Sequence, residues 1–245
     1  MMMYEWLILA LIGLCIGSFL NVAILRIPKN ESILFPSSHC YQCHQSLKWY
    51  HNIPLLSWLF LRGKCAFCGT SISFQYPLIE LLSALLYLLA FLHVKIFTEA
   101  LLLGTLFALL LALSVIDVRY KAVPDMLSLP ALLLSFLTNE PLQALQNGLL
   151  FMGGFCLLRF GVSSVLKKEV MGEADIIIAG IIGALLGIKL GFFAIYLSAV
   201  LALVVFMFVR KRGYELPYIP FLSTALLLTW LCDTSILTLL ELIYE

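Results

Sequence analysis

Four cysteines, arranged as two C-x2-C pairs, form the clearest metal-binding pattern in the sequence. About twenty residues separate the two pairs, a spacing typical of tetrahedral structural zinc sites. Each pair places two thiolates on one turn, and the two turns together complete the tetrahedron. Two disulfides or thiol redox chemistry are the alternatives, but disulfides do not persist on a reducing cytoplasmic face. We therefore predict that Zn²⁺ is bound by Cys40, Cys43, Cys65 and Cys68, with the nearby histidines at the surface: His39, His44 and His51.

Three aspartates form a second group that could carry chemistry. Asp117 ends a long apolar stretch, Asp125 follows Pro124, and Asp175 begins another apolar stretch. Two carboxylates that meet in a partly dry site share one proton, because both cannot ionise easily. Such a pair can activate a water molecule for peptide hydrolysis. For Asp125 the context favours a helix-capping role, and from polarity alone a cation-coupled transporter explains the aspartates equally well.

Composition identifies the kind of scaffold that must position these residues. The chain has 245 residues, of which 62% are hydrophobic and 12% charged, and its mean hydropathy is +1.05. Soluble domains carry about 45–50% apolar and roughly 25% charged residues. These values exclude a soluble enzyme, a disordered tail and a fibrous repeat, and they predict a polytopic protein of the lipid bilayer. The net charge of +1 gives no indication of nucleic-acid binding.

Eight apolar stretches are candidates for membrane spans, each of which needs about 20 residues. They lie at 4–25, 76–94, 98–117, 125–138, 142–159, 173–188, 190–209 and 218–243. Seven spans are the alternative, since 125–138 is short. With eight spans, 13 of the 15 Lys and Arg residues lie on one side together with all three aspartates, and the positive-inside rule assigns that side to the cytoplasm. We expect the first stretch to be a retained helix, not a cleaved signal peptide.

For several further residues near the first long connection, the sequence favours a structural role. Gly13 and Gly17 form a small-xxx-small pair that favours close helix packing, and Asn21 then faces the same interior, where its amide needs a partner. Glu80 is a buried acid inside the second stretch. We expect it either to pair with a basic residue of the connection or to shape the site, with a structural role favoured.

Taken in order, the motifs of the chain resemble those of the type IV prepilin leader peptidases, a family of bacterial inner-membrane aspartyl proteases that also N-methylate their product. The resemblance covers nearly the whole chain and rests on order and spacing. Asp117 with the downstream Pro-Asp resembles the first aspartate motif of the family, and 172–175 (GEAD) resembles its second, GxGD. The other matching segments are 17–22 (GSFLNV), 26–28 (RIP), the cysteine pairs, 52–55 (NIPL), 57–58 (SW), 62–64 (RGK), 72–73 (IS), 76–77 (YP) and Glu80.

The resemblance implies that Asp117 and Asp175 are the catalytic pair. It also implies cleavage of a short basic leader from prepilins or pseudopilins at the cytoplasmic face of the inner membrane, followed by methylation from S-adenosylmethionine. The donor's binding residues are unknown, and we place its site near the first span and the loop. The expected fold is an all-α polytopic membrane protein of about eight transmembrane helices with a cytoplasmic zinc-binding loop between helices 1 and 2. Its expected parts are the first helix (1–26), the loop (27–75) and a transmembrane aspartyl protease domain (76–245).

The chain departs from the family pattern near Asp175, and three rival functions stay open. Ala174 replaces the second glycine of GxGD, and alanine resists positive φ, so the approach to Asp175 could differ slightly, although we expect activity to survive. The nearest rival is a peptidase without methyltransferase activity. A transporter that uses the same aspartates and a zinc-loop scaffold of a secretion machine are rivals from other classes.

Overall fold

The structure is a computed structural model that describes residues 2–138, 140–167, 172–209 and 216–244. Its regular elements within these ranges are all helices, accompanied by two isolated β-bridges in the loop after α1. The all-α prediction is therefore confirmed. The main helices are α1 (Met2–Arg26), α2 (Leu56–Phe60), α3 (Gln75–Val94), α4 (Phe97–Tyr120), α5 (Asp125–Phe136), α6 (Pro141–Leu166), α7 (Glu173–Val209), α8 (Ile219–Leu231) and α9 (Asp233–Tyr244).

Helix α1 illustrates how the sequence produces these long helices. Its charged residues lie near the ends, with Glu5 in the first turn and Arg26 in the last, where each complements the helix dipole. Between them the helix is mostly apolar, with Ser18 and Asn21 as polar exceptions in its second half, as expected of a segment surrounded by lipid and other helices. The Arg26 guanidinium is itself buried and donates hydrogen bonds to the carbonyls of Ser32 and Pro36 at 3.1 and 2.8 Å. The last turn of α1 thus holds the first part of the loop.

The described residues contain five helices long and apolar enough to cross a membrane, which makes the chain a multi-pass membrane protein. These are α1, α3, α4, α6 and α7, and a sixth is added if α8 and α9 together count as one span. The eight predicted spans are therefore not confirmed. Helix α5 has 12 residues, a length of about 18 Å that is too short to cross the bilayer alone. The predicted span 218–243 is bent by 81° between α8 and α9, so it is not one straight helix.

Helix α7 is broken at Gly187. This residue has a φ of 68° and a ψ of −168°, which is not helical and is a conformation that favours glycine. The break falls inside the predicted span 173–188, one residue before its end, and close to the start of the predicted span 190–209. A Cβ at Gly183 or at Gly191 would lie 2.7 or 2.6 Å from the ring of Phe151. The two arms of α7 therefore both pack against the same aromatic ring of α6.

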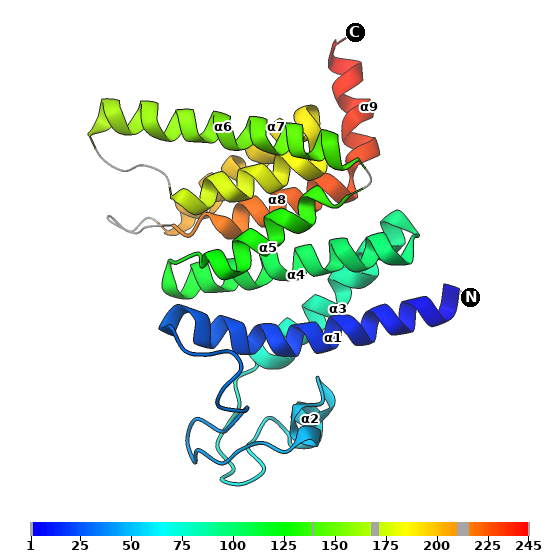
Figure 1. Cartoon of the computed structure of the whole chain (residues 1–245), viewed down its shortest axis with the longest axis vertical. Coiled ribbons are helices and arrows are strands. Elements are labelled where there is room, and N and C mark those ends of the chain that lie inside the picture. The colour runs from blue at the N-terminus through cyan, green and yellow to red at the C-terminus, as the bar shows by residue number, and fades with distance from the viewer. Residues whose placement is uncertain (1, 139, 168–171, 210–215, 245) are drawn as a thin grey trace. The chain divides into compact units, whose positions relative to one another are not determined.

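The contacts divide the chain into two units, residues 1–112 and 113–245, with the boundary inside α4. In the first unit α1 packs against α3 at Gly13 and Gly17, where an added Cβ would lie 2.6 Å from Ala84 Cα and 2.7 Å from Glu80 Cα. Only a residue without a Cβ permits such a close approach, which confirms the predicted packing role of the glycine pair. The loop that joins α1 to α3 carries α2 (Figure 1).

In the second unit α7 contacts α5, α6 and α8, so it forms the centre of that unit. Four of the basic residues behind the predicted charge asymmetry, Lys168 and 210–212, lie outside the described residues. The cytoplasmic orientation stays a prediction, as does the division into parts at 1–26, 27–75 and 76–245.

Candidate functional site

The four cysteine side chains of the loop meet at one point. Their Sγ atoms all lie within 4.8 Å of one another, and Cys40 Sγ and Cys68 Sγ are 3.8 Å apart. A tetrahedral zinc ion with Zn–S bonds of about 2.3 Å requires sulfur atoms about 3.8 Å apart. The chemistry and spacing of this donor set therefore fit a four-coordinate metal such as zinc. No histidine belongs to the group among the described residues.

Both cysteine turns are built by the same backbone hydrogen bonds. In the first, Cys40 N–H donates to Gln45 at 3.1 Å and His44 N–H donates back to Cys40 at 2.9 Å. In the second, Cys65 N–H donates to the carbonyl five residues on, and Gly69 N–H donates back to Cys65 at 3.0 Å. The residue after each pair has a positive φ, 55° at His44 and 72° at Gly69. The loop thus contains the same knuckle twice, and His44 has a backbone role in the first.

The thiols of the cluster differ in acidity. Hydrogen bonds from the side chain and then the backbone of Thr70 lower the pKa of Cys68 to about 6. At Cys43 the backbone N–H of Gln45 lowers the pKa, but desolvation and the neighbouring thiols Cys40 and Cys68 together raise it to about 11. All four cysteines are free thiols in the structure. The cluster therefore offers at least one thiolate to a cation at neutral pH.

Polar residues of α1 and α3 attach the loop to the helices. Glu80, which is buried, accepts a hydrogen bond from Leu55 N–H at 2.7 Å and a second from Ser18. Asn21 is fully buried and donates from its amide to the Tyr76 carbonyl at 3.1 Å. Within the described part of the chain Glu80 has no basic partner, so its predicted pairing with a basic loop residue is wrong there. Glu80 and Asn21 instead join α1, α3 and the loop, a structural arrangement.

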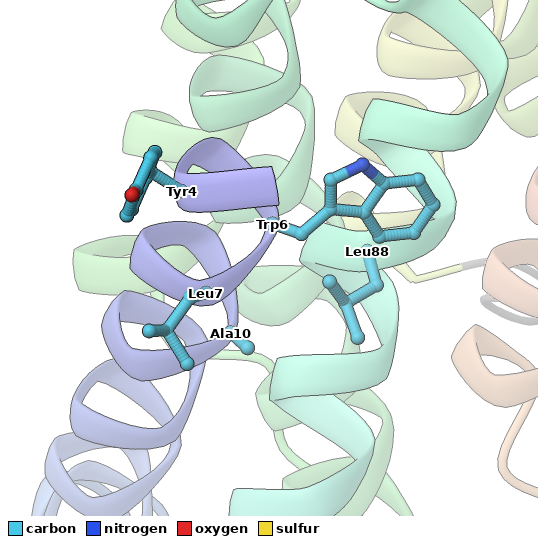
Figure 2. Close-up of a pocket in the computed structure, with 5 residues that line it drawn as sticks. All are labelled: Tyr4, Trp6, Leu7, Ala10 and Leu88. Carbon is cyan, nitrogen blue, oxygen red and sulfur yellow. The ribbon is translucent and has the colours of Figure 1, made fainter. Parts of the chain in front are cut away.

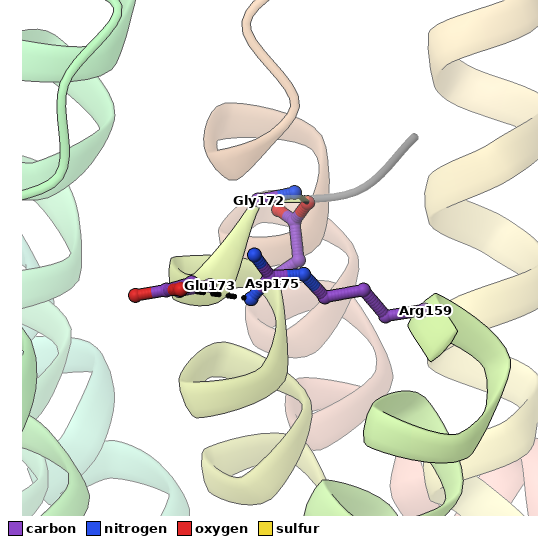
Figure 3. A network of polar contacts seen from close by, with 4 residues as sticks. All are labelled: Arg159, Gly172, Glu173 and Asp175. Atoms are coloured by element: carbon purple, nitrogen blue, oxygen red, sulfur yellow. Dashed lines mark hydrogen bonds and ion pairs between the residues drawn. The ribbon is translucent and has the colours of Figure 1, made fainter. Parts of the chain in front are cut away.

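The second unit contains the aspartates. Asp117 lies near the end of α4, is 7% exposed and accepts a hydrogen bond from Ile219 N–H at 3.1 Å. Asp175 lies in the first turn of α7 and accepts from Gly172 N–H, also at 3.1 Å (Figure 3). The two carboxylates are close enough for Asp117 to act electrostatically on Asp175. Each side chain is thus held by a backbone donor while the two charges interact.

Asp125 differs from these two residues. It is exposed and is the first helical residue of α5. The N-cap position before it is occupied by Pro124, and no side chain caps the helix from that position. The structure therefore places Asp125 one residue beyond the cap position that the sequence suggested. In the first turn its charge is still favourable, because it faces the positive end of the helix dipole.

The start of α8 is a part of this site that sequence reasoning missed. The Tyr218 hydroxyl is hydrogen-bonded to Ser198 Oγ at 2.9 Å, and Ser198 Oγ donates to Ile195 O at 2.7 Å. This tie fixes the beginning of α8 to the second arm of α7. The first N–H groups of a helix have no partner within the helix, and the one at Ile219 is thereby directed to Asp117. Proline in the first turn of α8 marks the helix start in the sequence, but no sequence signal identifies Asp117 as its acceptor.

The GEAD segment adopts an ordinary helix start. Ala174 lies in the first turn of α7 and is not among the residues with positive φ, so alanine is accommodated there without backbone strain. Arg159 of α6 forms an ion pair with Glu173 at 3.1 Å (Figure 3). The Glu173 side chain is 84% exposed, and such an exposed pair contributes little to stability.

A shallow apolar hollow lies at the other end of α1. It is lined by Tyr4, Trp6, Leu7 and Ala10 of α1 and by Leu88 of α3 (Figure 2). The Trp6 ring packs edge-on against Phe91, with ring centroids 5.3 Å apart. Its lining residues include no carboxylate, histidine or cysteine.

Comparison with known proteins decides the family. Residues 11–94 match the family model described as the bacterial peptidase A24 N-terminal domain, and residues 104–207 match that of the type IV leader peptidase family. A relative from Escherichia coli O78:H11, named type 4 prepilin-like proteins leader peptide-processing enzyme, is 35% identical over 86% of this chain and 88% of its own length. The chain belongs to the type IV leader peptidase family. The resemblance read from its motifs is thus confirmed.

Two further relatives of this chain share one name, prepilin leader peptidase/N-methyltransferase. That of Myxococcus xanthus is 35% identical over 84% of this chain, which spans only 64% of that relative's length. That of Dickeya chrysanthemi is 37% identical over 74% of this chain and 75% of its own length. No solved structure matches the chain significantly.

Proposed function

We propose that this chain removes the leader peptide from type IV prepilins or pseudopilins and N-methylates the new N-terminal residue. The observation that carries the proteolytic part is the aspartate pair. Asp117 and Asp175, which the motif resemblance singles out, interact electrostatically within one unit, and each is held by a backbone N–H. Membership of the type IV leader peptidase family and the names of the relatives support the same reaction.

The proposed cleavage uses the two carboxylates with one proton between them. The ionised carboxylate takes a proton from water, whose oxygen attacks the scissile carbonyl carbon, while the other carboxyl group protonates the carbonyl oxygen. When the resulting diol collapses, the second carboxylate takes back a proton from a diol hydroxyl, the C–N bond breaks, and the proton held by the first carboxyl group passes to the leaving amine. No covalent enzyme intermediate forms. Ile219 N–H and Gly172 N–H keep the two carboxyl groups oriented during these transfers.

For the methyl transfer we propose S-adenosylmethionine as donor, on the strength of the family resemblance and the relatives' names. The new N-terminal amine would accept the methyl group. Among the described residues no arrangement of side chains identifies a site for the donor, so we assign it no residues and derive no step through it.

We propose that the cysteine cluster binds Zn²⁺ structurally through Cys40, Cys43, Cys65 and Cys68. When bound, the ion would crosslink the two knuckles and supply folding free energy to a loop of some fifty residues with little core of its own. The close approach of the four sulfur atoms supports this proposal.

For topology we propose about eight membrane-crossing segments in the bacterial inner membrane, one of which consists of the short helix α5 together with the residues on either side of it. The loop and the aspartates would lie at the cytoplasmic face. The charge asymmetry of the sequence supports this orientation, and the break of α7 at Gly187 supports counting its two arms separately.

The direct test uses the purified full chain in detergent, a prepilin that retains its leader, and S-adenosylmethionine. Intact-mass spectrometry should find a product that is shorter by the leader and heavier by one methyl group. Shortening without methylation would leave a peptidase alone. An unchanged substrate, together with cation flux in vesicles that contain the protein, would favour the transporter instead.

A further inference from the structure

The loop contains one segment whose composition is unlike the rest of it. Residues 53–61 carry no charged side chain, and Ser57 is the only polar residue among them. Their large apolar side chains are not buried: Phe60 is 81% exposed, Leu59 67% and Leu56 51%. An aqueous loop that presented such a patch would be prone to association, so this surface needs a partner.

The depth of the segment indicates where that partner lies. Leu55, directly before α2, is hydrogen-bonded through its N–H to Glu80, which also bonds Ser18. Ser18 precedes Arg26, the last residue of α1, by eight residues, or about 12 Å along the helix axis. Glu80 lies five residues inside α3, about 7 Å from its start. Helix α3 has 20 residues, a length that just spans the hydrocarbon core of about 30 Å. The start of α2 therefore lies beside the spanning helices, at a level that is further into the membrane than the ends of α1 and α3 that join the loop.

The backbone of the segment is suited to a medium without water. Ser57 N–H donates to Ile53, Leu59 N–H to Leu55 and Leu61 N–H to Ser57, at distances of 3.0 to 3.1 Å. The Ser57 hydroxyl donates to the Ile53 carbonyl at 2.8 Å. In hydrocarbon, backbone polar groups must be satisfied within the protein. The hydrogen bonds of this turn satisfy the N–H groups of Ser57, Leu59 and Leu61 in that way.

A fixed contact orients the exposed side chains. Trp58 donates from its indole N–H to the Ile72 carbonyl at 3.3 Å, and its ring packs against Phe74 with centroids 5.8 Å apart. The same ring lies against Gly63, where an added Cβ would be 2.9 Å away. Trp58 thus faces the loop, while Leu59 and Phe60, the next two residues, remain exposed.

The residues that flank the segment complete the pattern of a membrane interface. Trp49, 79% exposed, and Tyr50 precede it, and Lys48, Arg62 and Lys64 surround it, all exposed. Tryptophan and tyrosine gather at the level of the lipid headgroups. Exposed lysine and arginine beside them attract the anionic headgroups of a bacterial-type membrane.

We propose that α2 and its flanks insert into the adjacent bilayer leaflet, where Leu56, Leu59 and Phe60 contact phospholipid acyl chains. The loop is then fixed to the membrane by side chains of its own in addition to its two connections. The proposal requires neither proteolysis nor methylation by this chain, so it can fail or succeed independently of the proposed function.

Photocrosslinking of the full chain in vesicles of phosphatidylethanolamine and phosphatidylglycerol tests this proposal. p-Benzoylphenylalanine replaces Phe60 in one protein and, as the matched control, Tyr41 in another; Tyr41 is an aromatic residue of the first knuckle that is 53% exposed. After irradiation, intact-mass spectrometry should find an increase equal to one phospholipid at position 60 and none above background at position 41. Leu59 offers a second position should a label at 60 disturb the loop.

Two results would overturn the proposal. The first is the absence of lipid adducts at both 59 and 60 while the purified proteins keep their wild-type elution and metal content. The second is a change of adduct when a leader-bearing prepilin is added: position 60 then crosslinks to the prepilin and no longer to lipid. This result would make the segment a docking surface for the substrate's apolar helix.

Discussion

The cysteine cluster of the loop and the aspartate pair of the second unit bring together residues that are separated by very different distances in the sequence. Each cysteine knuckle is closed by backbone hydrogen bonds that span four or five residues. Asp117, in contrast, is held by the N–H of Ile219, 102 residues away. A site built from local turns can be recognised from its spacing alone. A site built by helix packing can be recognised only through a motif or through the structure.

The largest effect is expected from a substitution in the cysteine cluster, the site that is built from local turns. Cys65→Ala removes one of four thiolates from a cluster whose metal affinity corresponds to about 10–16 kcal/mol in comparable zinc sites, so the purified protein should lose most of its bound zinc. Metal analysis by mass spectrometry measures this loss. Cys15→Ala is the matched control, since Cys15 lies on α1 outside the cluster, and it should leave the zinc content unchanged. Full zinc occupancy in Cys65→Ala would rule out the four-thiolate site.

A smaller effect tests the packing on which the loop depends. In Gly17→Ala the new Cβ would lie 2.7 Å from Glu80 Cα, a backbone atom that cannot move aside easily. We expect destabilisation of about 1–3 kcal/mol, seen as a lower unfolding temperature in detergent. Gly153→Ala in α6 is the control, because nothing lies within 4 Å of its Cβ. Equal behaviour of the two variants would contradict the close approach of α1 and α3.

The smallest effect concerns the aspartate site, whose residues are far apart in the sequence. Tyr218→Phe removes the hydrogen bond to Ser198 that fixes the start of α8. A lost hydrogen bond of about 0.5–1.5 kcal/mol should lower kcat for leader cleavage by up to about tenfold and leave KM nearly unchanged. Steady-state kinetics with a prepilin substrate separate the two constants.

Tyr196→Phe serves as the control for that measurement. Tyr196 also lies on α7, but it is 69% exposed, so its replacement should leave kcat at the wild-type value. A Tyr218→Phe variant with unaltered kcat would mean that the tie between α7 and α8 does not position Asp117.

The sequence predicted the local features well. The cysteine cluster, the apolar helices and the close contact at Gly13 and Gly17 all follow from spacing and periodicity, which short-range structure obeys. The pairing of Asp117 with Asp175 was predicted from motif resemblance, because the local sequence around either residue does not identify the other as its partner. The role of Tyr218 and Ile219 could not be predicted, since it depends on how α8 packs against α7. The span count was not confirmed, because α5 has only 12 residues and because hydropathy does not detect the 81° bend between α8 and α9.

The central claim is that Asp117 and Asp175 act as a pair, and one measurement tests it most directly. The wild type and the Asp117→Asn, Asp175→Asn and Asp125→Asn variants are each incubated with a leader-bearing prepilin, and the product is followed by intact mass. We expect either change in the pair to slow cleavage by about 10²–10⁴-fold, with zinc content unchanged, and Asp125→Asn to cleave at nearly the wild-type rate. Cleavage at the wild-type rate by the Asp117→Asn or the Asp175→Asn variant would contradict a catalytic role for the pair.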